Sequence, residues 1–135
     1  MTTYVQVRVA AEDYAIPVEH VLEIARLTSV TAVPGAPPAL LGIHRLHGQI
    51  LPVIDIVTLL GIPRQAPPVC LLVAQAGGRQ AGLAIDEVSK VGPLADPAEE
   101  TESDLLAGAT LTEGQLVGII DVARVFDAAG GGADE

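Results

Sequence analysis

Apolar and polar residues alternate along several short stretches of the chain, a pattern typical of half-buried β-strands. Residues 4–9 place three valines on one face and polar side chains on the other. The polar residues 11–13 then turn the chain into a second strand at 14–16, so a hairpin is expected here. Pro17 suits the start of a short helical turn over residues 18–21, and an extended run follows it.

The same alternation predicts three further hairpins, each with a glycine in its turn. Their strands are 43–46 with 50–54, 69–74 with 80–85, and 105–111 with 115–120, and 88–91 is a further strand. Asp55 and Asp121 precede short apolar runs that end near residues 60 and 128, so both are expected to cap short helices. Residues 130–135 are rich in glycine and are expected to form a frayed tail.

Two stretches of the chain recur at a nearly constant spacing. Residues 48–60 are similar to residues 114–126, and residues 14–24 are similar in type to residues 81–91. Self-similarity of this kind indicates one supersecondary unit that is used twice. The chain is therefore expected to contain two related halves, joined by a short stiff linker at residues 64–68.

Composition supports a β-rich core and narrows the choice of partners. Half of the residues are hydrophobic, but only Tyr4, Tyr14 and Phe126 are aromatic, so Val, Ile, Leu and Ala must fill the core. The net charge of −10 would repel a phosphate backbone or an anionic membrane surface. We therefore expect no nucleic-acid partner and no direct membrane insertion. Five acidic residues crowd into 96–104, which reads as a solvated loop.

The cellular location and the thiol can also be judged from the sequence. The N-terminus has no continuous apolar stretch of the kind found in secretory signals, and no run of 18 apolar residues exists. A cytoplasmic protein is the expectation. Cys70 is the single cysteine and lies within an apolar run, which favours a buried and inert thiol over a reactive one.

Few residues point to catalysis. Asp55 and Asp121 invite an acid–base pair, but their equivalent positions in the repeat favour helix capping, because a repeat places equivalent residues apart. His44 and His47 point to opposite faces of any extended stretch, so a metal site that also uses His20 requires the turn to bring them together. No nucleophile elbow, phosphate-binding glycine loop or CxxC motif is present.

A binding module without catalytic activity, cofactor or metal is therefore the leading hypothesis. Small β-rich halves with many Val, Leu and Pro residues are typical of protein-recognition modules that use edge strands and shallow grooves. A small metal-dependent hydrolase that uses Asp55, Asp121 and the histidines is the remote alternative.

Three sequence patterns then occur in order along nearly the whole chain. The pattern Y-x-I-x-(x)-x-x-V-x-E-I is met by Tyr14, Ile16, Val21, Glu23 and Ile24. The pattern G-x-x-N-L-R-G-x-I-x-P-V-x-D-L is met by Gly42, Leu46, Gly48, Ile50, Pro52, Val53, Asp55 and, conservatively, Ile56. The pattern G-x-x-V-D-x-V is met by Gly82, Ile85, Asp86 and Val88. Together they resemble the CheW-like domain family, whose members couple chemoreceptors to the histidine kinase CheA.

The resemblance implies an all-β fold in which two SH3-like five-stranded β-barrel subdomains pack around a shared hydrophobic core, with short helices and a C-terminal helix. Residues 1–135 would form a single CheW-like domain. Its subdomains would cover approximately 14–68 and 69–121, and the N-terminal strand and C-terminal helix would complete the pair.

The resemblance also implies partners and sites. The partners would be the regulatory domain of a CheA-type histidine kinase and the cytoplasmic tip of a chemoreceptor. Motif positions imply a receptor-facing groove formed by Val21, Glu23, Gly42, His47, Cys70, Gly82 and Val88. The strand after Glu23 implies kinase docking at Arg26, Leu27 and Val30.

Two positions depart from the family pattern. Arg45 stands where the family has Asn, and His47 stands where it has Arg. Arginine is always charged and forms bidentate hydrogen bonds, whereas histidine is shorter and is neutral over part of the physiological range. An adaptor of a divergent pathway, such as one for twitching, gliding or development, is therefore the second hypothesis.

Overall fold

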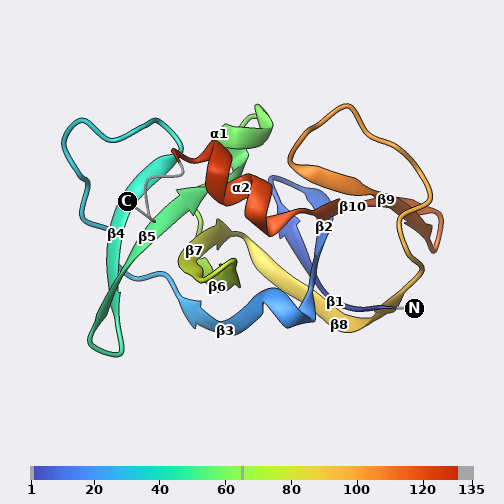
Figure 1. The fold of residues 1–135 in the computed structure, drawn as a ribbon, viewed down its shortest axis with the longest axis horizontal. Helices are drawn as coiled ribbons and strands as arrows, with labels where there is room; N and C mark the ends of the chain where they lie inside the picture. Colours follow the sequence, from blue (N-terminus) through green and yellow to red (C-terminus); the bar gives the residue numbers. More distant parts are fainter. Residues whose placement is uncertain (1, 65, 131–135) are drawn as a thin grey trace.

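The structure is a computed structural model that describes residues 2–64 and 66–130. Its elements (Figure 1) are β1 (Thr2–Val9), β2 (Glu12–Pro17), the 3-10 helix η1 (Val18–His20), β3 (Val21–Arg26), β4 (Leu40–Leu46), β5 (Gln49–Asp55), α1 (Ile56–Leu60), β6 (Cys70–Ala76), β7 (Arg79–Ile85), β8 (Glu87–Leu94), β9 (Leu106–Thr112), β10 (Gln115–Ile120) and α2 (Val122–Ala128). The four predicted hairpins are present. The predicted tail lies outside the described residues, apart from Gly130.

Each hairpin turns through two residues with positive φ, which match the right-handed twist of the flanking strands. Three of these turns end in glycine, as the sequence predicts. The first turn consists of Ala10 and Ala11 instead of residues 11–13, so β2 starts earlier than predicted. Two side chains hydrogen-bond to the backbone of this turn. The Asp86 carboxylate accepts from the Ala10 N–H, and the Arg8 guanidinium donates to the Ala11 carbonyl.

The strands form two five-stranded sheets. Sheet A has the order β8-β1-β2-β10-β9, and sheet B has the order β3-β6-β7-β5-β4. All but two of the neighbouring strand pairs are antiparallel, and the exceptions are the parallel pairs β2–β10 and β5–β7. The predicted all-β fold with two five-stranded sheets is confirmed.

The two halves of the chain exchange strands. Sheet A combines β1 and β2 from the first half with three strands of the second half, and sheet B makes the opposite combination. The parallel pairs join the halves at equivalent places, because Ile119 pairs with Ala15 as Val53 pairs with Gly82. Each sheet therefore contains strands from both halves of the chain.

The ends of each sheet approach each other through an isolated bridge. Thr31, beyond the end of β3, exchanges two 2.9 Å hydrogen bonds with Ile43 on β4. Glu99, beyond the end of β8, makes the equivalent bridge to Ala109 on β9. Gly42 has a φ of 152°, and a Cβ there would overlap the Thr31 carbonyl. Glycine at this position therefore allows the segment that contains Thr31 to pass close over β4. The resulting bridge bends the sheet toward the shape of a small barrel.

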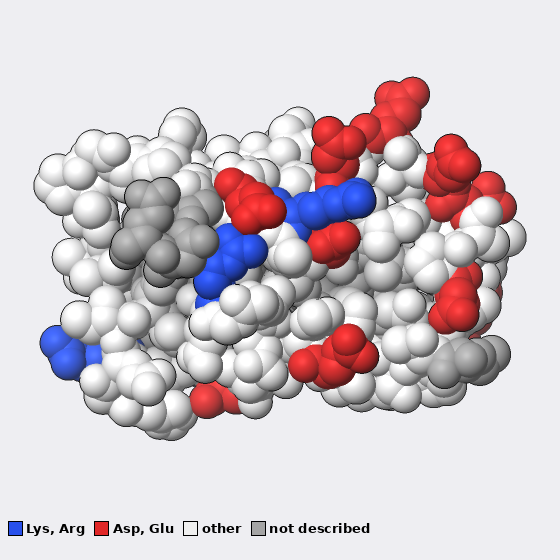
Figure 2. Space-filling view, viewed as in Figure 1, with Lys and Arg blue, Asp and Glu red and all other residues white. Residues whose placement is uncertain are grey.

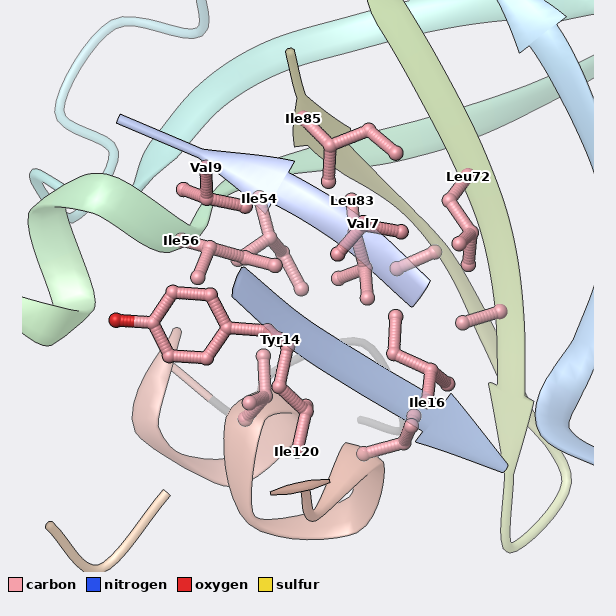
Figure 3. Close-up of a cluster of buried hydrophobic side chains, with 14 of the residues drawn as sticks. Val7, Val9, Tyr14, Ile16, Ile54, Ile56, Leu72, Leu83, Ile85 and Ile120 are labelled. Carbon is pink, nitrogen blue, oxygen red and sulfur yellow. The ribbon is translucent and has the colours of Figure 1, made fainter. Parts of the chain in front are cut away.

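One large apolar core lies between the sheets, and each sheet encloses a smaller core of its own. The shared core contains Val7 and Ile16 of sheet A and Leu72 and Leu83 of sheet B, all fully buried (Figure 3). Both helices contribute to it. The smaller core of sheet A includes Val117 and Ile119, and that of sheet B includes Val53 and Leu71. Alternate residues of one strand therefore pack into two different cores. Burial of each aliphatic side chain stabilises the folded state by about 1.5–3 kcal/mol.

Candidate functional site

The Glu23 and His47 side chains are brought together by the curvature of sheet B. Glu23 lies on β3 and His47 in the β4–β5 turn, at opposite ends of the strand order. The His47 Nε2 atom lies 3.0 Å from Glu23 Oε2. The His47 side chain is 72% exposed and that of Glu23 is 39% exposed, so the pair is a surface contact that a partner can reach. His47 has a φ of 52° and occupies the first position of a two-residue turn with Gly48.

Val21, Cys70 and Val88 lie on three different strands and pack against the edge of the shared core. Val21 and Val88 occupy equivalent positions of the repeat, on the outer strands β3 and β8. Both strands have only one partner strand, and Figure 1 shows them along the same lower edge of the molecule. Cys70 is only partly buried, in contrast to the buried thiol that the sequence predicts. This partial burial raises the pKa of the Cys70 thiol, as expected of an unreactive side chain.

Two exposed residues extend this apolar edge and were not predicted as site residues. Ile24 is 44% exposed and Val91 is 60% exposed, and they occupy equivalent positions of the repeat. Ile24 pairs with Leu72 and Val91 pairs with Val5, and both partners belong to the shared core. Residues paired across strands share a face of the sheet. We call Val21, Ile24, Val88 and Val91 the seam patch. The repeat in the sequence shows that Val21 is equivalent to Val88 and Ile24 to Val91, but it does not show which of these residues are exposed.

Gly42 and Gly82 do not line this edge, in contrast to the predicted groove. Both are buried, Gly42 beneath Thr31 and Gly82 against the Leu71 side chain, where a Cβ would overlap its neighbour. Their place in the sequence motifs therefore reflects close packing of sheet B. Motif positions alone do not separate packing residues from contact residues.

Two of the three predicted kinase-docking residues line a surface hollow beside sheet B. Leu27 and Val30 line a cavity of about 260 Å³ together with Leu41 and Pro68. Both side chains also reach the inner core of sheet B, so they are only partly exposed. Arg26 is exposed at the end of β3 and pairs across strands with Cys70. The hollow is separate from the Glu23–His47 pair, although both depend on β3.

The two aspartates at the helix starts have different roles. Asp121 accepts a hydrogen bond of 3.2 Å from the Arg124 N–H, so its predicted capping role is confirmed. The Asp55 side chain makes no such bond, so the prediction that it caps α1 is wrong in this respect. Its Oδ2 atom instead accepts from the Thr58 hydroxyl at 2.7 Å and pairs with Arg64. Asp55 is 3% exposed, and this burial favours an ion pair that neutralises its charge.

The three histidines lie apart and have separate partners. His20 Nδ1 lies 3.0 Å from the Gln75 carbonyl, and His44 Nδ1 lies 2.7 Å from the Ser29 carbonyl. Within residues 2–64 and 66–130, no three His, Cys, Asp or Glu side chains are grouped so that they could hold a metal ion. None of the described helices is long and apolar enough to cross a membrane.

Charge is distributed unevenly between the two sheets. Residues 2–17 and 86–121, which form sheet A and its connections, contain eleven acidic and two basic residues. Residues 18–85 contain three acidic and four basic residues. Figure 2 shows acidic side chains gathered toward the end of the molecule that sheet A occupies in Figure 1. The two ends therefore offer different electrostatic environments to partners.

Comparison with known proteins places this fold and sequence in one family. A family model described as the CheW-like domain matches residues 3–130. The chemotaxis protein CheW of Rhizobium meliloti (strain 1021) is 30% identical over 129 residues, which cover 88% of this chain and 83% of that protein. Protein FrzA of Myxococcus xanthus is 34% identical over 83 residues, which cover 60% of this chain and 52% of that protein.

A solved structure has the same architecture. The crystal structure of the scaffolding protein TtCheW from Thermoanaerobacter tengcongensis matches with a TM-score of 0.84 and 27% identity, covering 93% of this chain and 87% of that chain. The family model spans nearly all of the residues that form the two sheets and the three cores. The chain belongs to the CheW-like domain family.

Proposed function

We propose that the chain is a non-catalytic adaptor that couples chemoreceptors to a CheA-type histidine kinase. The observation that carries this proposal is the match of the CheW-like family model to residues 3–130, together with the likeness to TtCheW. Two separate surfaces, the seam patch and the hollow beside β3, suit an adaptor, because an adaptor must hold two partners at once.

The seam patch and the Glu23–His47 pair form the proposed receptor-binding surface. Val21 and Val88 pack against the shared core. Ile24 and Val91 are exposed and pair across strands with residues of that core. The cytoplasmic tip of a receptor is a helical hairpin in the family, and an amphipathic helix binds through an apolar stripe. Glu23 pairs with Val73 and so lies on the other face of β3 from the seam patch; with His47 it adds a polar contact beside this edge strand that can fix the orientation of the helix.

The receptor surface can be tested with a soluble cytoplasmic fragment of a chemoreceptor from the same organism. Val91→Glu places a charge in the seam patch and should weaken binding at least tenfold in calorimetric titration. Leu111→Glu is the matched control, because Leu111 is 66% exposed on the same sheet and lies outside the patch. Equal binding by Val91→Glu and the unmodified protein would exclude the seam patch as the receptor site.

The hollow lined by Leu27 and Val30, together with Arg26, which precedes Leu27 in the chain, forms the proposed kinase-binding surface. The test is calorimetric titration with the regulatory domain of the organism's CheA-type kinase. Arg26→Glu should raise the dissociation constant about tenfold, whereas Arg45→Glu, on the exposed side of β4, should change it less than about twofold. No association of the folded protein at tens of micromolar would contradict the kinase-coupling function itself.

An adaptor of a divergent pathway is the second candidate, and His47 is the residue that favours it. Protein FrzA of Myxococcus xanthus shares 34% identity over 60% of this chain, so the sequence is also similar to a protein that is not named for chemotaxis. His47→Arg restores the residue of the family pattern. If receptor affinity is unchanged by this substitution, position 47 does not select the receptor.

A further inference from the structure

Sheet A contains a groove that neither the receptor surface nor the kinase surface uses. The parallel strands β2 and β10 pair only through Gly118–Tyr14 and Ile119–Ala15. Before these pairs the two strands diverge, and residues 115–117 and 12–13 have no strand partner on the facing side. The divergence opens a hollow of about 470 Å³, which we call the sheet A groove.

The walls of the sheet A groove combine apolar and acidic side chains. Leu106 and Leu116 line it, and Leu116 is 58% exposed. Glu12 and Asp13 line the opposite wall. That wall is held in place, because Arg8 pairs with Asp13 at 2.9 Å and the Tyr14 hydroxyl donates to Glu12 at 2.8 Å. A fixed wall lowers the entropy lost when a ligand binds.

The groove lies in the most acidic part of the molecule. Thr101 lines it, and residues 96–104 around Thr101 carry five carboxylates. None of these five carboxylates forms an ion pair with the side chains that the structure describes. An uncompensated negative field of this kind attracts a cationic partner and increases its rate of association.

The repeat supplies an internal comparison. Strands β5 and β7 diverge in the same way in sheet B, and a hollow of about 870 Å³ lies at the equivalent place. Ile50, 55% exposed, takes the place of Leu116 there. Its opposite wall carries Arg79 and Gln80 in place of Glu12 and Asp13. The shape thus follows from the shared architecture, whereas the acidic character belongs to sheet A alone.

We propose that the sheet A groove binds a lysine- or arginine-rich extended segment of a partner protein. The diverging strands offer unpaired backbone edges to which an extended chain can add as a short strand. Residues 115–117 span about 10 Å, which matches about three residues of such a segment. Leu116 contacts an aliphatic side chain of the segment, and the surrounding carboxylates attract its basic side chains. This interaction is additional to the proposed receptor and kinase contacts.

The experiment uses the full chain labelled with ¹⁵N and a capped peptide, Lys-Thr-Lys-Val-Lys-Thr-Lys, as the probe. Titration followed by NMR should give saturable shifts concentrated at residues 12–14 and 115–118, with a dissociation constant between about 10 μM and about 1 mM. The affinity should fall at high salt, because the charges are exposed. A peptide with Glu in place of Lys should not bind.

Matched variants separate the groove from charge alone. Leu116→Ser should weaken peptide binding at least threefold, whereas Ile50→Ser, at the equivalent place in sheet B, should leave it unchanged. The double variant Glu100→Gln and Glu102→Gln should weaken binding more than Glu19→Gln with Glu87→Gln. Absence of saturable shifts, shifts spread over all acidic segments, or shifts at residues 49–52 and 77–80 would overturn the proposal. The measurement needs neither kinase nor receptor, so its outcome is independent of the proposed function.

Discussion

Asp55 shows that equivalent residues of a repeat can acquire different roles. It precedes α1 as Asp121 precedes α2, but it is nearly completely buried and uses its carboxylate for Thr58 and Arg64. The Asp55 Oδ1 atom has no hydrogen-bond partner among the described residues. A buried carboxylate with one free oxygen depends strongly on its remaining ion pair.

Arg64→Met should lower the free energy of unfolding by about 1–3 kcal/mol, because it leaves the Asp55 charge buried without its partner. The estimate lies below the value for a fully buried pair, since the Arg64 side chain is 30% exposed. Urea denaturation followed by circular dichroism measures the change. Arg124→Met is the control, because its partner Asp121 lies in a more exposed pair. An equal effect of the two substitutions would contradict the special role of Asp55.

Stability should fall at alkaline pH because of the buried Tyr14 hydroxyl and the partly buried Cys70 thiol. Burial raises the pKa of the Cys70 thiol, and burial together with the hydrogen bond to Glu12 raises the pKa of the Tyr14 hydroxyl. The ordinary values are about 8.5 and about 10. The folded state holds both protons more tightly, so this stability is complete below those values and is lost as pH rises above them.

The unfolding temperature should therefore decrease from about pH 9 upward, and part of the decrease should disappear in Tyr14→Phe. Differential scanning calorimetry at a series of pH values provides the measurement. If Tyr14→Phe shows the same alkaline decrease as the unmodified protein, ionisation of Tyr14 does not contribute to it.

The curvature of sheet B depends on one glycine in β4. The segment beyond β3 crosses Gly42 to form the Thr31–Ile43 bridge, and the same arrangement recurs at Gly108 in sheet A, where a Cβ would lie 2.9 Å from the Glu99 carbonyl. This curvature also brings Glu23 to His47. A packing feature of one strand thus determines the geometry of the proposed receptor surface.

Gly42→Ala should lower the free energy of unfolding by about 3 kcal/mol or more, because the added methyl group overlaps the Thr31 backbone. Gly48→Ala should cost only about 1 kcal/mol, since Gly48 has positive φ but open space around it. Thermal unfolding of both variants tests the difference. A smaller loss in Gly42→Ala than in Gly48→Ala would show that the bridge is dispensable.

The exchange of strands makes the two halves of the molecule interdependent. Sheet A needs β1 and β2 from the first half, and sheet B needs β6 and β7 from the second half. The shared core collects side chains from both sheets and both helices. Removal of either half would expose this core and leave both sheets incomplete.

Fragments 1–68 and 69–135 should therefore show no cooperative thermal unfolding when each is studied alone, and their mixture should regain β-structure by circular dichroism. A control fragment pair cut within the loop 95–105 should associate in the same way. Cooperative unfolding of either half by itself would mean that a sheet can form without its exchanged strands.

The sequence was sufficient to predict the strands, the hairpins and the repeat. Alternation with a period of two and glycine in tight turns act over a few neighbouring residues, so these features are local. The Ala10–Ala11 turn was misplaced because it lacks glycine and is held by the distant Asp86. Among the site candidates, Glu23 and His47 do meet, whereas Gly42 and Gly82 are packing residues, which motif positions alone do not reveal.

Tertiary structure alone decided which strands share a sheet and which apolar residues remain exposed. The parallel pairs β2–β10 and β5–β7 join segments far apart in the chain, and no local pattern specifies such pairing. Register shifts in β3 and β8 place Ile24 on the same face as Val21 and Val91 on the same face as Val88, which strict alternation does not predict. Ile24 and Val91 remain exposed because β3 and β8 lie at the ends of their sheets. Alternation determines which side of a strand is apolar, but only the neighbours that pack against that side determine whether it is buried.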